Sequence, residues 1–285
     1  MLNAVLGNKV DQCKRKDPIL TEMKPQALGI QKQRFASART ILSLMLREMA
    51  TSYGKSPSDF FWAVAEPVLS IALLTFVFSL ALKSPSLGSN FAIFYASGYL
   101  PFYVYSQVQL KIANSLSFSK RLLSYSRVKF TDAIFARLFV NLAILVTVFY
   151  FLVTAIEWLY VTHTVHQYEY MILGVLMATI MGLGVGTLNI FLFVYVPNWE
   201  NLWRIVTRPL VFLSAVLYIV EDVPTEYQKY LLINPLTHVT GMVRKGFYPT
   251  YTADHISVSY VMGFGLTCFA VGLFFLFLFR KQMRS

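Results

Sequence analysis

Cysteine and charge are both scarce in this sequence. The 285 residues include two cysteines, Cys13 and Cys268, and they fall in segments too different in character for a disulfide or a cysteine metal site. Charged residues make up 14% of the chain and hydrophobic residues 56%. This composition leaves no room for a sizeable soluble domain, because such a domain needs a polar surface.

Motifs for nucleotide binding, metal binding and hydrolysis are also missing. Gly54-Lys55-Ser56 matches the end of a phosphate-binding loop, but Met49 occupies the place of its first glycine. No Gly-x-Ser-x-Gly turn occurs. The polar first forty residues contain no signal-peptide pattern. The histidines show no zinc-ligand spacing; they are His163, His166, His238 and His255. We therefore expect no cofactor, no metal and no catalytic site in this chain.

Six apolar stretches are long enough to cross about 30 Å of hydrocarbon. They lie at approximately 60–82, 91–116, 133–156, 170–196, 204–220 and 256–279. Most Lys and Arg residues fall on one side of these stretches, so by the positive-inside rule both termini are cytoplasmic. The sequence predicts an all-α, multi-pass protein of a bacterial inner membrane with six transmembrane helices. Its net charge of +11 reflects this topology rather than nucleic-acid binding.

The remaining segments divide the chain further. Residues 1–30 have no apolar period and predict a flexible cytoplasmic tail. Residues 31–57 carry apolar side chains at three- and four-residue spacing, which predicts an amphipathic helix on the membrane face. Residues 58–285 then form the transmembrane domain. The prolines and short apolar run of residues 221–250 predict short re-entrant or interfacial helices on the outer face, between the fifth and sixth spans.

Polar and aromatic side chains within the spans are candidates for a translocation pathway, because polar groups in lipid are costly unless they serve a function. Glu66 precedes the helix-kinking Pro67; it either lines a path or satisfies backbone groups or an arginine locally. The aromatic residues of the second span either line a path or only pack. Arg137 either lines the path or, because it is near the cytoplasmic end of its span, extends its guanidinium to the membrane surface. The candidates are Trp62, Glu66, Tyr95, Tyr99, Phe102, Tyr103, Arg137, Arg204 and Arg208.

Two further patterns concern packing between helices and between proteins. The basic segment 119–130 is either a topology signal or a surface helix that inserts into a partner's groove. Ala178, Gly182 and Gly186 repeat at four-residue intervals and predict close helix packing, within the subunit or across a dimer. The candidate contact residues of the basic segment are Lys120, Arg121, Ser124, Tyr125 and Arg127.

Four segments, taken in order, carry a resemblance to a known family. They run from Phe61-Trp62 to Glu66-Pro67, from Gly98 to Phe102, from Tyr125 to Lys129, and from Leu231 to Pro235 followed by His238 and Arg244. In this order they resemble the permease subunits of type-2 ABC exporters (the type V ABC exporter fold), in the capsular polysaccharide branch of the KpsM kind. The similarity covers nearly everything after residue 35.

The resemblance implies a homodimer of six-span subunits that exports a lipid-linked, acidic capsular polysaccharide across the inner membrane. It also implies two separate ATPase subunits that bind ATP and Mg, a periplasmic adaptor of the polysaccharide co-polymerase type, and an outer-membrane export protein. Without a nucleotide motif in this chain, energy must come in trans, and segment 120–130 is the best docking candidate for the ATPase.

Two alternatives remain open from the sequence. An ABC-2 exporter of O-antigen, teichoic acid, or a small lipid or drug would share the architecture. A membrane-embedded glycosyltransferase or acyltransferase would instead use outer-face residues such as His238, Asp254 and Glu226, although these residues show no motif spacing.

Overall fold

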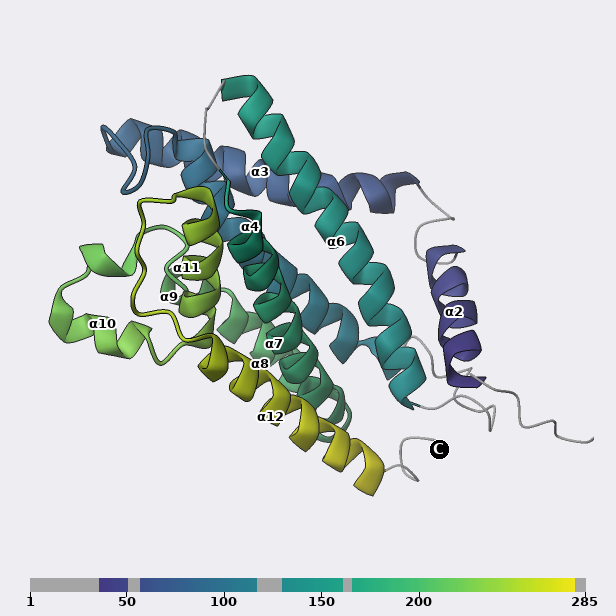
Figure 1. The fold of residues 1–285 in the computed structure, drawn as a ribbon. Helices are drawn as coiled ribbons and strands as arrows, with labels where there is room; N and C mark the ends of the chain where they lie inside the picture. The colour runs from purple at the N-terminus through teal and green to yellow at the C-terminus, as the bar shows by residue number, and fades with distance from the viewer. Residues whose placement is uncertain (1–35, 51–56, 117–129, 161–165, 280–285) are drawn as a thin grey trace, which may run out of the picture. The chain divides into compact units, whose positions relative to one another are not determined.

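The computed structural model describes residues 36–50, 57–116, 130–160 and 166–279. The chain divides into two compact units, Met1–Arg39 and Thr40–Ser285, and the following description concerns the second. All regular elements of the described residues are helices (Figure 1). The expected cytoplasmic tail and the candidate ATPase-contact residues of segment 119–130 lie outside the described residues.

Long apolar helices dominate the fold. They are α3 (Pro57–Ala81), α6 (Phe130–Tyr160), α7 (Tyr168–Tyr195) and α12 (Val258–Leu278), and all four are long and apolar enough to cross a membrane. The 23-residue helix α4 (Phe91–Ala113) is long enough as well, but its tyrosines and glutamines make it less apolar. Preceding them, α2 (Ala36–Glu48) lies within the stretch expected to form an amphipathic helix.

The stretch expected as the fifth span, 204–220, is not one helix. Helix α8 (Trp199–Thr207) ends before Arg208-Pro209, and the four-residue α9 (Leu210–Leu213) follows. Pro209 cannot donate a backbone hydrogen bond, which interrupts the helical ladder, and Ala215 then takes a left-handed φ of 51°. The chain continues without regular helix until the single 3-10 turn η3 (Val220–Asp222).

Two short helices occupy the region 221–250, where the sequence predicts short helices. They are α10 (Thr225–Leu231) and α11 (Pro235–Phe247). The Asn234 side chain accepts a hydrogen bond from the Leu236 backbone N–H, 3.1 Å away, and caps α11, with Pro235 in the first turn. Helix α11 packs against α7 and α4.

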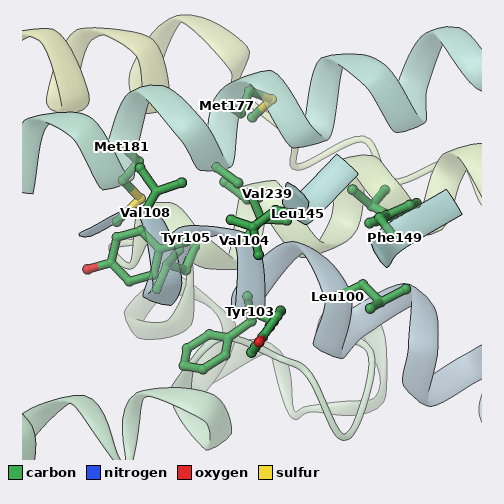
Figure 2. Packing of buried hydrophobic residues seen from close by; sticks show 14 of the residues in the cluster. Leu100, Tyr103, Val104, Tyr105, Val108, Leu145, Phe149, Met177, Met181 and Val239 are labelled. Carbon is green, nitrogen blue, oxygen red and sulfur yellow. The ribbon is translucent and has the colours of Figure 1, made fainter. Parts of the chain in front are cut away.

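The core lies around α7, which packs against α4, α12 and α11 (Figure 1). The expected small-residue stripe makes its close contacts within the chain, because a Cβ on Gly186 would lie 2.8 Å from the Gln109 carbonyl oxygen of α4. A Cβ on Gly182 would similarly meet Val108 at 3.0 Å. Figure 2 shows Val108 and Tyr105 of α4 beside Met181 of α7.

Candidate functional site

A polar cluster lies between α3 and α4, in the apolar part of the molecule. The carboxylate oxygen Oε2 of Glu66 accepts hydrogen bonds from the Tyr103 hydroxyl at 3.4 Å and from the Gln107 side-chain amide at 3.3 Å. The ring of Tyr99 stacks on that of Tyr103, with centroids 6.1 Å apart and an interplanar angle of 21°. We call Glu66, Tyr99, Tyr103 and Gln107 the Glu66 cluster.

Helical spacing explains why the three side chains of α4 lie together beside Glu66. Tyr99, Tyr103 and Gln107 are four residues apart along α4, so they share one face. Pro67 leaves the carbonyl of Ala63 without its helical donor, and the Tyr103 hydroxyl donates to that oxygen at 3.3 Å. The freed backbone group is thus satisfied by Tyr103, not by Glu66.

The Glu66 cluster opens to the outside of the chain. Glu66 is exposed, and Trp62, one turn earlier on α3, has 60% of its surface exposed. With a rise of 1.5 Å per residue, Glu66 lies about 8 Å beyond Phe61, where the apolar candidate span begins. A carboxylate at this depth is too costly to face hydrocarbon, so water or another protein surface must cover it.

The other aromatic candidates of α4 are buried in packing contacts. Tyr95 is 1% exposed, stacks with Phe91 and meets Phe94 edge to face in a small second core beside Ile219. Phe102 is buried near Tyr105. The aromatic residues that looked alike in the sequence therefore divide into packing residues and members of the Glu66 cluster.

The three arginines predicted for the pathway do not share one site. Arg137 is buried on α6 and contacts Glu48 of α2 and the Asn114 carbonyl at the end of α4. Arg204 is exposed on α8 and pairs with Glu200 one turn before it. Arg208 is exposed at the break after α8.

Helix α11 holds the broken segment after α9 through side-chain bonds to four backbone carbonyls. Thr237 and Asn234 donate to the Leu213 oxygen, Thr240 donates to the Ser214 oxygen at 2.8 Å, and Arg244 donates to the Val216 and Tyr218 oxygens at 2.7 and 2.6 Å. These carbonyls have no helical partners because the helix has ended. The guanidinium of Arg244 also lies over the Phe94 ring, 4.6 Å from its centroid.

Comparison with known proteins now identifies the architecture. The ABC-2 type transporter membrane domain matches residues 39–248, which is most of the chain. The chain belongs to the ABC-2 type transporter family. The match includes the Glu66 cluster, the Glu48–Arg137 pair and all of α11.

Among ABC-2 proteins, this chain is similar to several curated permeases of capsule export. It is 27% identical over 235 residues to the polysialic acid transport protein KpsM of Escherichia coli, covering 82% of this chain and 91% of KpsM. It is 25% identical over 238 residues to the capsule polysaccharide export inner-membrane protein CtrC of Neisseria meningitidis, covering 82% and 89%. For the protein BexB of Haemophilus influenzae the identity is 24% over 251 residues, covering 87% and 91%.

His238, one of the residues suggested for an enzyme, has structural contacts within this ABC-2 domain and with the segment after it. The two ring nitrogens of His238 bond the Leu232 carbonyl and the Ser257 N–H, at 2.9 and 3.3 Å. His255 lies 3.2 Å from Glu221, and burial lowers the pKa of His255. Within the described residues, no group of three or more His, Cys, Asp or Glu side chains could hold a metal ion.

Two contact residues escaped the sequence reasoning. Gln107 continues the four-residue repeat of Tyr99 and Tyr103, and this spacing could have signalled it. Glu48 had no such signal, because its partner Arg137 belongs to a helix far along the chain.

Proposed function

We propose that this protein is the permease subunit of an ATP-driven exporter that moves a lipid-linked capsular polysaccharide across the bacterial inner membrane. Its ABC-2 domain and the similarity to capsule export proteins over most of their length support this proposal. The structural observation that carries it is the Glu66 cluster. The exposed carboxylate of Glu66 and the partly exposed Tyr99 and Gln107 lie on helices long enough to span a membrane, and the buried Tyr103 bonds that carboxylate.

The chemistry of this cluster suits sugars. Aromatic faces such as those of Trp62 and Tyr99 offer flat apolar surfaces for sugar rings, and the buried Tyr103 hydroxyl orients the Glu66 carboxylate beside them. Glu66 and Gln107 can exchange their mutual hydrogen bond for bonds to sugar hydroxyls. Weak, repeated contacts of this kind allow a polymer to move along the path without being bound tightly at one position. The proposed path does not include Tyr95, Phe102 and Arg137, because their side chains are buried in contacts within the subunit.

Arg204 and Arg208 complete the proposed path electrostatically. Both are exposed on or beside the amphipathic helix α8, and positive charge there would attract an acidic polymer. In the proposed architecture the broken α8–α9 segment is the fifth span and α4 the second. Both termini are then cytoplasmic, and α10 and α11 are the re-entrant helices of the outer face.

The proposed assembly is a homodimer with two ATPase subunits. A second copy would cover the exposed Glu66 face and enclose the path with it, because the carboxylate cannot face lipid. ATP and Mg would be bound by the ATPase subunits, which would contact Lys120, Arg121, Ser124, Tyr125 and Arg127. A periplasmic adaptor and an outer-membrane export protein would carry the polymer onward.

Deletion of the gene in its native host tests the proposal. We expect bare cells with polysaccharide retained in the cytoplasm, and restoration of the surface polymer by the intact gene. Loss of polymer synthesis would favour a membrane transferase, whereas an unchanged capsule would favour an exporter of a small lipid or drug. A strain that carries Lys120→Glu with Arg121→Glu should retain the polymer as the deletion does, if these residues dock the ATPase.

A further inference from the structure

A buried ion pair connects α2 to the transmembrane helices. Arg137 Nε lies 3.3 Å from Glu48 Oε1, and the two side chains are 10% and 12% exposed. The Arg137 guanidinium also donates through Nη1 to the Asn114 carbonyl, 3.0 Å away, at the C-cap of α4. One arginine thus holds three elements together: α2, the end of α4 and the first third of α6.

Stability alone is a weak reason for such a pair. Removing two charges from water costs about as much as their attraction returns, and well-packed apolar residues of similar volume are often at least as stabilising. Buried ionic pairs are better attested as devices that select one arrangement of elements over another. The Glu48–Arg137 pair fits that role, since its partners come from different helices.

The position of the pair is relevant to energy transfer. Arg137 contacts the end of α4 and lies on α6, and these are the two helices that flank segment 117–129. Helix α2 is not among the elements that pack extensively with one another in the described residues, and the Glu48–Arg137 pair is one of its side-chain contacts with the long helices. Leu42 and Leu46 of α2, and Met49 just after it, are more than half exposed and leave that side of α2 open to another surface.

We propose that Glu48 and Arg137 are positioning residues that couple the cytoplasmic helix α2 to α4 and α6. A displacement imposed at the cytoplasmic side then moves these three elements together, and α4 carries it to Tyr103 and Gln107 of the Glu66 cluster. Arg137 therefore acts in transmission rather than by contact with the polymer. This inference rests on the proposed export function.

The test separates transmission from stability with four variants in the native host. Glu48→Gln and Arg137→Gln each break the pair. The double variant Glu48→Leu with Arg137→Met replaces it by an apolar contact, and Arg137→Lys retains the charge. For each, we would measure surface and retained polysaccharide, the amount of permease in the membrane, and ATP hydrolysis by the purified complex with its co-purifying ATPase.

We expect the apolar pair to reach the wild-type membrane level and to hydrolyse ATP, yet to export about tenfold less polymer per ATP hydrolysed, within the range of coupling between sites. The single Gln variants should show the same loss, and Arg137→Lys should recover most of it because its ammonium can still face Glu48. Lys83→Glu, a charge reversal at an exposed residue, is the matched control and should export normally.

Three results would overturn the inference in different ways. If the double variant Glu48→Leu with Arg137→Met exported as much polymer per ATP hydrolysed as the wild type, the contact would be only structural. The proposed export function would be unaffected by that result. A deletion strain with an unchanged capsule would remove both the function and the coupling role. Parallel loss of membrane level, hydrolysis and export in all four variants would also reject a role in transmission.

Discussion

The hydroxyl of Tyr103 lies 3.3 Å from the carbonyl oxygen of Ala63, the oxygen that Pro67 leaves without a helical donor. The same hydroxyl contacts Glu66 Oε2. One tyrosine of α4 therefore compensates the proline break in α3 and positions the carboxylate beside it. Because these groups are in an apolar setting, the loss of either contact leaves a polar atom that is costly to bury.

Removal of this hydroxyl should destabilise the α3–α4 pair. Tyr103→Phe keeps the ring but leaves the Ala63 oxygen without its donor, which should cost about 1–3 kcal/mol of unfolding free energy. Thermal unfolding of the purified protein in nanodiscs measures the change. Tyr150→Phe, at an exposed tyrosine of α6, is the control; an equal loss there would contradict the assigned contact.

The carboxylate of Glu66 should matter for transport more than for folding. Glu66→Gln keeps the shape and most hydrogen bonds, whereas Glu66→Leu removes the acceptors of Tyr103 and Gln107. We expect a small loss of export for the first and a loss of about tenfold or more for the second, the scale of a lost hydrogen bond to a charged group. Surface polysaccharide at equal membrane levels gives the comparison, and equal export by both variants would exclude a role for this side chain.

Charge reversal at Arg208 tests the electrostatic part of the path. Arg208 is exposed, so Arg208→Glu should leave the fold intact and lower the export of an acidic polymer about tenfold, as expected when a focusing charge is inverted. The retained fraction of polysaccharide reports the effect. Unchanged export would show that Arg208 does not guide the polymer.

Gly98 should tolerate no side chain. A Cβ there would lie 2.7 Å from the Val216 carbonyl oxygen and 2.8 Å from Arg244 Nη2, so Gly98→Val would push α4 away from the segment that α11 holds. Overpacking of this kind costs about 1–3 kcal/mol, visible in thermal unfolding and in the membrane level. At Gly263 a Cβ meets nothing within 4 Å, and Gly263→Val should have a much smaller effect on both.

The region around His255 should lose stability in mild acid. Burial lowers the pKa of His255 below its usual 6.5, against the opposing effect of Glu221. The unfolded chain then binds a proton that the folded one does not, so stability is present above pH 6.5 and declines as the pH falls from there toward the folded pKa. Unfolding at about pH 7.5 and 5.5 should show the decline, and His255→Gln should reduce it. A pH response that this variant leaves unchanged would exclude His255 as its source.

Much of the secondary structure was accessible from sequence because it depends on local properties. Apolar runs at 60–82, 133–156, 170–196 and 256–279 correspond to α3, α6, α7 and α12. The break at Arg208-Pro209 was visible as a motif, but its consequence was not, because a proline can either kink a helix or end it. The outcome depended on α11, whose Thr240 and Arg244 bind the carbonyls left after the break.

Only part of the candidate site could be predicted from the sequence. The cost of a carboxylate in lipid drew attention to Glu66, and the density of aromatic residues in the second span drew attention to Tyr99 and Tyr103. Neither could separate these residues from Tyr95 and Phe102, because a helix buried on several sides has no polar face to mark its orientation. That assignment required the packing of α4 against α7, where Gly182 and Gly186 allow close approach.

The sequence by itself determined the solvent, the helices and the family of this protein, since hydropathy, periodicity and motif order are properties of neighbouring residues. Tertiary structure alone decided which helix faces meet. Gln107 contacts Glu66 across 41 residues, and Arg137 contacts Glu48 of a different helix. Such pairings depend on how whole helices pack. The sequence around a charged side chain does not indicate which distant residue will pair with it.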